Sequence, residues 1–145
     1  MLGSPSSPAV ALFFIGNYAI ELCARLFHLR TIGAGALLPR DQKEAAVFFA
    51  VSLSAGFCEE VVFRGYLQRQ FHSVTRSALL AILLQAVVFG VSHGYQGIDA
   101  MLRITVYGIF FGLTTHLCKS ILPTILTHAW QDVFSGIIQR WSSIL

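Results

Sequence analysis

The stretch CEEVVFRGYLQRQF, residues Cys58–Phe71, places two adjacent glutamates and an arginine directly after an apolar run. That run, AVFFAVSLSAGF at residues 46–57, carries no charge at all. An ionised carboxylate at the centre of a membrane helix costs on the order of 2.5–3.5 kcal/mol. Two explanations therefore compete: a membrane helix that ends at the water surface, or a catalytic site built inside the bilayer.

The composition is that of an integral membrane protein. Of the 145 residues, 55% are hydrophobic and 12% are charged, whereas a soluble domain carries about 25% charged residues. So few charges cannot cover a surface that faces water. The net charge of +3 comes from scattered basic residues, most of them near the ends of apolar runs, where their side chains reach the membrane interface. We therefore predict no nucleic-acid partner.

Apolar residues form five successive segments, at about residues 8–27, 43–71, 76–93, 98–118 and 121–141. About 20 such residues cross a hydrocarbon core of about 30 Å. Within lipid these segments must be helical, because lipid offers no hydrogen-bond partner to an open backbone. We expect an all-α, polytopic transmembrane bundle of about five helices with a polar active site inside the membrane.

Two parts follow from this division: an N-terminal membrane helix and loop at residues 1–43, and a core at residues 44–141. The sequence DQKE, Asp41–Glu44, is typical of a helix start. By alternation the loop before it shares a side with the C-terminus, and the basic residues there favour a cytoplasmic position, with the N-terminus outside. The expected location is the plasma membrane, if the source is a prokaryote.

Ionisable residues inside the apolar segments are functional candidates, because each is costly unless it is paired or faces a cavity. They are Glu59, Glu60, Arg64, His93, His128 and Asp132. With a rise of about 1.5 Å per residue, Glu59 lies near the middle of its helix, and His93 and His128 reach a comparable depth if their helices are neighbours. A single histidine on an apolar helix is usually structural. The joint set on three segments is what indicates a site.

Helical spacing separates the roles of the two glutamates. Glu60 and Arg64 stand at i and i+4, in the favourable order for a salt bridge, so Arg64 is expected to keep Glu60 ionised. Glu59 points about 100° away and has no such partner, which leaves it available as a general base. His128 and Asp132 share a helix face. They either act together on one centre, or Asp132 orients the imidazole.

Three motifs resemble those of the CPBP family of intramembrane proteases, which includes CAAX prenyl endopeptidases and bacteriocin-processing, bacteriocin-immunity and abortive-infection-like proteins. EEVVFRG (Glu59–Gly65), FGVSH (Phe89–His93) and HAWQD (His128–Asp132) match its EExxxR, FxxxH and HxxxN or HxxxD motifs in order. The resemblance implies an endopeptidase acting on a membrane-embedded or membrane-tethered peptide.

The resemblance also implies roles for the candidate residues. Glu59 would activate the hydrolytic water with help from His93, and Arg64 would hold Glu60. His128 and Asp132 would polarise the scissile carbonyl or stabilise its oxyanion. Many members carry Asn where this chain has Asp132, and an ionised Asp cannot donate to an oxyanion.

No cofactor is indicated with certainty. If a metal takes part, zinc held by Glu59, His93 and His128 is the candidate, and Glu60 or Asp132 would then be the base. The alternatives to an enzyme are an inactive membrane immunity or scaffold protein and a small proton-coupled transporter. The chain is short for the family, so it is either a minimal member or a fragment, and an oligomer could support its stability.

Overall fold

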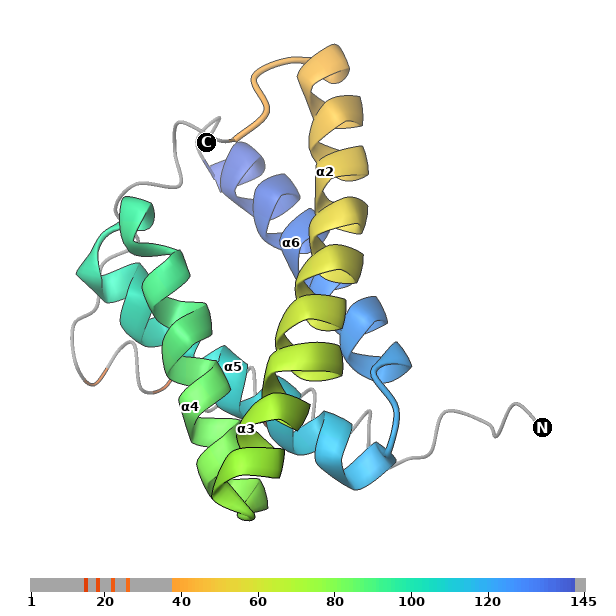
Figure 1. Cartoon of the computed structure of the whole chain (residues 1–145). Helices are drawn as coiled ribbons and strands as arrows, with labels where there is room; N and C mark the ends of the chain where they lie inside the picture. The colour runs from red at the N-terminus through yellow and green to blue at the C-terminus, as the bar shows by residue number, and fades with distance from the viewer. Residues whose placement is uncertain (1–14, 16–17, 19–21, 23–25, 27–37, 143–145) are drawn as a thin grey trace.

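The computed structural model describes residues 38–142 and, before them, residues 15, 18, 22 and 26 (Figure 1). Every regular element within these residues is helical. The elements are α2 (Gln42–Glu60), the π-helix η2 (Val61–Leu67), α3 (Gln68–Thr75), α4 (Ala78–Ser92), the 3₁₀ turn η3 (Gly94–Gln96), α5 (Ile98–Cys118) and α6 (Leu122–Ser142). The predicted first membrane helix, residues 8–27, lies outside the described residues except for those four single positions, each of which is helical.

The elements α2, η2 and α3 form one continuous helix of 34 residues, Gln42–Thr75. It starts as the sequence predicts, because the Asp41 carboxylate accepts a hydrogen bond of 2.8 Å from the Glu44 amide. It ends at Arg76, which adopts a left-handed conformation with φ of 56°. The sequence did not predict η2, a stretch of wider turns that begins directly after Glu60. Such π segments occur frequently at functional sites.

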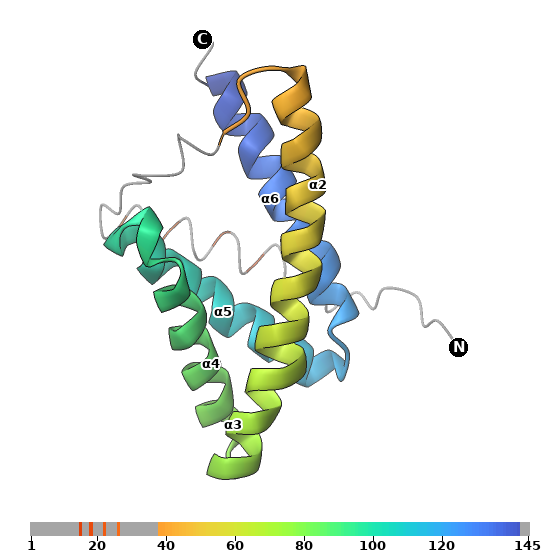
Figure 2. The same cartoon turned by 45° about the horizontal axis from the view of Figure 1, so that its top comes forward.

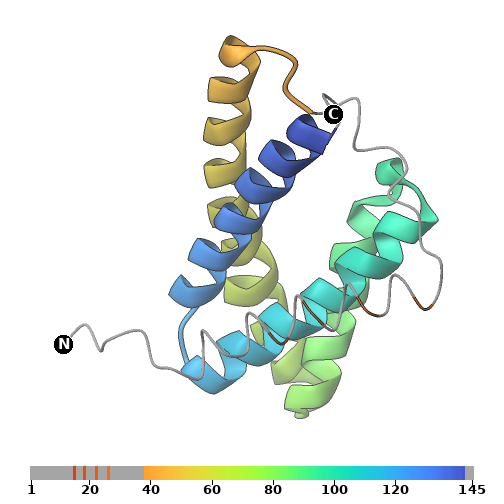
Figure 3. The same cartoon turned by 180° about the vertical axis from the view of Figure 1, so that it is seen from behind.

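The long helix connects two helix pairs. Its first half, α2, packs along α6, and its last part, α3, packs against α4, which in turn packs against α5. Figures 1 and 2 show the α2–α6 pair and the α4–α5 pair diverging from the region where the long helix meets α4. Seen from behind, the short connection between α5 and α6 brings α6 back alongside α2 (Figure 3). This arrangement places the middle of the long helix next to both pairs.

Glycine allows α2 and α6 to approach each other closely. A Cβ atom on Gly56 would lie only 2.7 Å from the Ala129 backbone nitrogen. The α4–α5 pair uses the same device, since a Cβ on Gly108 would lie 2.9 Å from the Cα of Ala86. Small residues at helix crossings are typical of membrane bundles. The contact between Gly56 and Ala129 matters most, because Ala129 directly follows His128.

The interior of this bundle contains several large polar residues, and many large apolar residues are exposed on its outside. The largest fully buried side chains are Arg64, Gln85, Glu60 and Thr124. Large apolar side chains are exposed along the helices, for example Phe49, Leu53 and Phe57 on α2. A protein in water shows the reverse distribution, since contiguous exposed apolar surface there is small. The distribution suits a lipid environment.

Two of the described helices are long and apolar enough to cross a membrane, Gln42–Thr75 and Ile98–Cys118. The apolar helix α4 is shorter. Length and composition therefore agree with a membrane protein of all-α fold. The count of five membrane helices stays a prediction.

Candidate active site

Glu60 and Arg64 form the buried base of the site. Arg64 Nη1 donates a hydrogen bond of 2.7 Å to Glu60 Oε1, and both side chains are 0% exposed. The predicted i, i+4 pair is therefore present. A pair buried this deeply costs desolvation free energy, which is offset only by good geometry and further hydrogen bonds.

His128 supplies one of those further bonds. Its Nδ1 lies 2.9 Å from Glu60 Oε1, the same oxygen that accepts from Arg64. Because an ionised carboxylate only accepts, Nδ1 carries the hydrogen and donates it. The close contact of Gly56 with Ala129 holds α6 near enough for this bond. Glu60 thus orients His128, and Nε2 is the nitrogen left to face the rest of the site.

His93 is oriented in the same way by a backbone carbonyl. It caps the C-terminus of α4, and its Nδ1 lies 2.8 Å from the Phe89 carbonyl oxygen. A carbonyl can only accept, so Nδ1 carries the hydrogen here as well. Its Nε2 then lies 3.7 Å from Glu59 Oε2.

Glu59 faces both imidazoles with a single oxygen. Its Oε2 is 3.7 Å from His93 Nε2 and 3.8 Å from His128 Nε2, and it has no hydrogen-bond partner within the described residues. The Glu59 side chain is 29% exposed, whereas that of Glu60 is fully buried. The two adjacent glutamates therefore differ as the helical spacing predicts: one is paired and enclosed, and the other faces the histidines.

Asp132 lies on the Nε2 side of His128, with its Oδ2 3.7 Å from that nitrogen. The partner of Nδ1 is Glu60 and not Asp132. Both predictions for Asp132, action on a common centre and orientation of the ring, stay predictions.

Aromatic rings enclose the buried charges. The Arg64 guanidinium lies 4.2 Å from the centre of the Phe89 ring and 5.2 Å from that of Phe111. Phe89 also contacts the His93 ring at 4.9 Å and Phe111 contacts the His128 ring at 5.3 Å. Sequence reasoning assigned no role to Phe111. The signal for it was the run FFGLTTH, Phe110–His116, which resembles the Phe- and Gly-containing helix of the CPBP family.

Gln68 and Gln85 are two further buried polar residues that sequence reasoning missed. Gln85 Nε2 donates to the Gly108 carbonyl oxygen at 2.8 Å, and Gln68 Nε2 donates to that of Gly112 at 3.1 Å. Both bonds join the neighbouring helices to α5. An uncharged polar residue in an otherwise apolar helix would have been the signal for Gln85.

The site brings together three carboxyl groups, two imidazole rings and one guanidinium. Carboxyl and imidazole groups can both take up and release protons. A cluster of this kind can accept and release protons, which is the property that acid–base catalysis requires.

The side chains as placed do not form a metal centre. Among the described residues, no group of three or more His, Cys, Asp or Glu side chains converges as metal ligands. The Nε2 atoms of His93 and His128 have suitable chemistry, since their Nδ1 atoms are engaged elsewhere. Zinc binding by Glu59, His93 and His128 stays a prediction.

A comparison with known protein families matches residues 41–134 to the Rce1-like family, described as type II CAAX prenyl endopeptidase Rce1-like. The chain belongs to this family. The resemblance drawn from the three motifs is confirmed, and the Rce1-like region contains all six candidate residues. No curated protein and no solved structure matches the chain significantly. Membership of a family of membrane endopeptidases, together with the two long apolar helices, indicates a membrane protein of the peptidase class.

Proposed function

We propose that this Rce1-like chain is an intramembrane endopeptidase that cleaves a membrane-embedded or membrane-tethered peptide with a water molecule activated by Glu59. Residues 44–141 would form its catalytic core in a multi-pass bundle. One observation carries the proposal: a single oxygen of Glu59 faces Nε2 of both His93 and His128, at 3.7 and 3.8 Å. The orientation of both rings by their Nδ1 atoms supports it.

The first step is removal of a proton from water by Glu59. Its Oε2 has no hydrogen-bond partner within the described residues, so its lone pairs are available to the water. The resulting hydroxide adds to the carbonyl carbon of the scissile peptide bond while Glu59 keeps the proton. A positioned general base of this kind contributes about 10²–10⁴-fold to the rate.

The second requirement is stabilisation of the oxyanion that forms on the carbonyl oxygen. His128 meets it by donating Nε2–H, since its Nδ1–H remains on Glu60. For this role His128 must carry a proton on both ring nitrogens. The carboxylates of Glu60, Glu59 and Asp132 lie around the ring and stabilise its positive charge. The Asp132 carboxylate then stabilises the positive charge of the His128 ring, and an ionised Asp can do this.

The intermediate breaks down when its peptide nitrogen receives a proton. Glu59 returns the proton that it took from water, either directly or through Nε2 of His93. The C–N bond then breaks. One product carries a new carboxyl group, and the other carries a new amine. Glu59 is again ionised and ready for another water.

Glu60 and Arg64 are positioning residues in this mechanism. Glu60 Oε1 accepts from both Arg64 and His128, so it sets the tautomer and the direction of the catalytic ring. Neither residue needs to touch the substrate.

The length of α4 supports a site below the membrane surface. Its 15 residues extend about 22 Å, less than the hydrocarbon core of about 30 Å. If its first residue lies at one interface, His93 at its other end remains within the membrane. A peptide bond tethered near a lipid anchor could reach it there.

The direct test is a cleavage assay on the purified full chain in detergent or lipid nanodiscs. The substrate is a peptide that ends in a CAAX sequence with a prenylated cysteine, and its unprenylated form is the comparison. Glu59→Gln keeps the size of the side chain but removes the base, so we expect kcat to fall by about 10²–10⁴-fold.

Glu44→Gln is the matched control, because Glu44 is the carboxylate at the far end of the same helix. It is expected to cleave at the wild-type rate. Wild-type activity in a folded Glu59→Gln variant would contradict the mechanism. If the wild-type chain cleaves neither peptide, CAAX peptides are not its substrates, and the proposed substrate class is wrong.

A further inference from the structure

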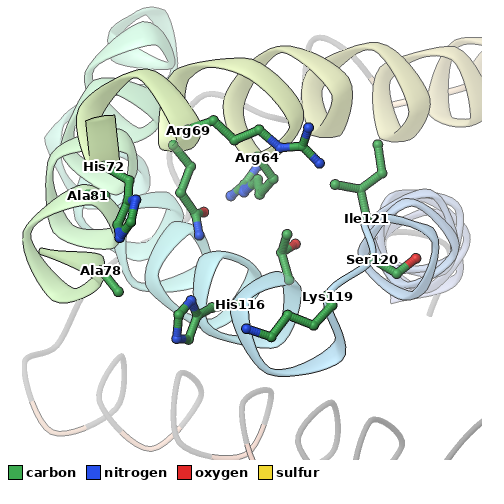
Figure 4. Close-up of a pocket in the computed structure, with 11 residues that line it drawn as sticks. Arg64, Arg69, His72, Ala78, Ala81, His116, Lys119, Ser120 and Ile121 are labelled. Atoms are coloured by element: carbon green, nitrogen blue, oxygen red, sulfur yellow. The ribbon is translucent and has the colours of Figure 1, made fainter. Parts of the chain in front are cut away.

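Arg64 also lines a cavity that none of the other candidate residues lines. Its volume is about 350 Å³, and it is bounded by η2, α3, the start of α4, the end of α5 and the connection between α5 and α6 (Figure 4). One water occupies about 30 Å³ of liquid, so the cavity has room for roughly ten. It is large enough for a polar group of several atoms.

The lining of this cavity is strongly basic. Its ionisable residues are Arg64, Arg69, His72, His116 and Lys119, and no Asp or Glu lines it. Figure 4 shows the two arginines on one wall, with His116 and Lys119 on the wall opposite. Like charges that face one another across a cavity repel, and a bound anion removes that repulsion.

Arg64 supplies the independent sign of a ligand. It is 1% exposed, and while Nη1 binds Glu60, its Nε and Nη2 have no hydrogen-bond partner within the described residues. Buried donors left without a partner carry the full cost of their desolvation. Arg64 also lines the cavity, so an anion bound there would lie beside its buried positive charge and offset part of the cost of burying it.

The rim provides further donors. No hydrogen bond or ion pair in the described part of the chain involves the side chains of Arg69 or Lys119, and both residues are exposed. The Ser120 hydroxyl accepts from the Leu122 amide, so its own hydrogen remains available to a ligand. The hydrogen-bond donors that line this cavity come from η2, α3, the end of α5 and the connection between α5 and α6.

We propose that this cavity binds a phosphate group, either that of an anionic lipid headgroup or free phosphate. Arginine forks match phosphate oxygens in pairs. Basic pockets at the ends of membrane helices take up anionic headgroups. The site is separate from Glu59 and does not depend on the proposed proteolysis. An anion bound there would lie beside the guanidinium that holds Glu60.

The test measures binding by the full chain, without an activity readout. The protein is placed in nanodiscs of phosphatidylcholine alone or with phosphatidylglycerol, and separately in neutral detergent with inorganic phosphate. Unfolding midpoints and retained lipid by native mass spectrometry are recorded. We expect a higher midpoint with an anionic ligand and at least a tenfold loss of affinity in the double variant Arg69→Gln/Lys119→Gln.

Two variants control for general charge effects. Arg76→Gln removes a positive charge at the same end of the bundle but outside the cavity lining, and Lys119→Arg keeps the charge within it. Both should bind as wild type does. Stabilisation by phosphatidylglycerol alone assigns the site to lipid, and stabilisation by inorganic phosphate assigns it to the free ion. The proposal is overturned if neither ligand stabilises the protein, or if the double variant loses no more affinity than Arg76→Gln.

Discussion

Arg64 separates two regions that differ completely in charge. On one side of it, Glu59, Glu60 and Asp132 surround two histidines. On the other side lies a cavity with basic residues and no carboxylate. The long helix contributes to both regions. Its residues Glu59 and Glu60 belong to the acidic region, and Arg69, further along the same helix, lines the basic cavity. A single buried guanidinium therefore serves as counter-charge to one region and as part of the lining of the other.

The difference shows how few side chains organise the interior of this bundle. The acidic region is held together by paired hydrogen bonds and aromatic rings, so its groups have defined directions. The basic region has no such internal pairing. Four sets of variants test this contrast: at the boundary, at the contact between α2 and α6, at the edge of the acidic region, and outside both regions.

The largest effect is expected from Arg64→Met, which removes the group shared by the two regions. It leaves Glu60 buried without its counter-charge, and breaking a buried pair costs about 3–5 kcal/mol. Urea or thermal unfolding in detergent measures the loss. The double variant Glu60→Gln/Arg64→Met should recover part of the stability but none of the activity. Equal stability of single and double variants would show that the pair is not coupled.

A smaller effect is expected at the helix contact that positions the acidic region. Gly56→Ala places a Cβ against the Ala129 backbone, so α6 must move and His128 with it. Misplacement by about 1 Å costs on the order of 10²-fold in catalysis. Gly65→Ala is the matched control in the same long helix, since its Cβ would meet nothing closer than 3.8 Å. Cleavage rates that fall equally in both variants would contradict this account.

Asp132 tests the edge of the acidic region. Because it contacts His128 only at 3.7 Å, we expect Asp132→Ala to lower kcat by roughly tenfold, the equivalent of about 1.4 kcal/mol. Asp132→Asn should lose less, since the amide can donate directly to an oxyanion. Steady-state measurement of kcat and KM distinguishes the two. A loss as large as that of Glu59→Gln would make Asp132 the base instead.

The smallest effect is expected at Gln85, which lies outside both regions. Gln85→Leu removes two buried hydrogen bonds, to the Ile82 carbonyl within α4 and to the Gly108 carbonyl of α5. Only the second joins two helices, and such a bond contributes about 0.5–1.5 kcal/mol. Unfolding should detect a loss of that size, with cleavage unchanged at saturating substrate. A large fall in kcat would show that the α4–α5 contact also positions the site.

Local features of the structure were predictable from sequence because they depend on neighbours within one helix. The start of α2 at Asp41 and the single helix through Phe71 follow from capping chemistry and the absence of a breaker. The range 98–118 predicted for the fourth segment agrees with α5. The Glu60–Arg64 bond follows from i, i+4 spacing. The six candidate residues could be named from sequence because charges are rare within apolar runs, and their catalytic roles stay predictions.

Contacts between helices were not predictable in the same way. Both predictions for His128 and Asp132 considered only residues on one helix, and neither included the hydrogen bond between His128 and Glu60 on another helix. The wider turns of η2 were not predicted, because the sequence of Val61–Leu67 has no feature that distinguishes a π-helix from an α-helix. The basic cavity has no sequence motif, since its residues lie far apart along the chain.

The sequence by itself determined that this protein is helical, apolar on its outside and a member of a peptidase family, and that Glu59 and Glu60 are not equivalent. Composition and short helical spacings carry that information directly. Only the tertiary structure decided which nitrogen of each histidine faces Glu59 and where Arg64 divides the two charged regions. Those features depend on the close approach of separate helices, such as Gly56 against Ala129, and no local pattern specifies that approach.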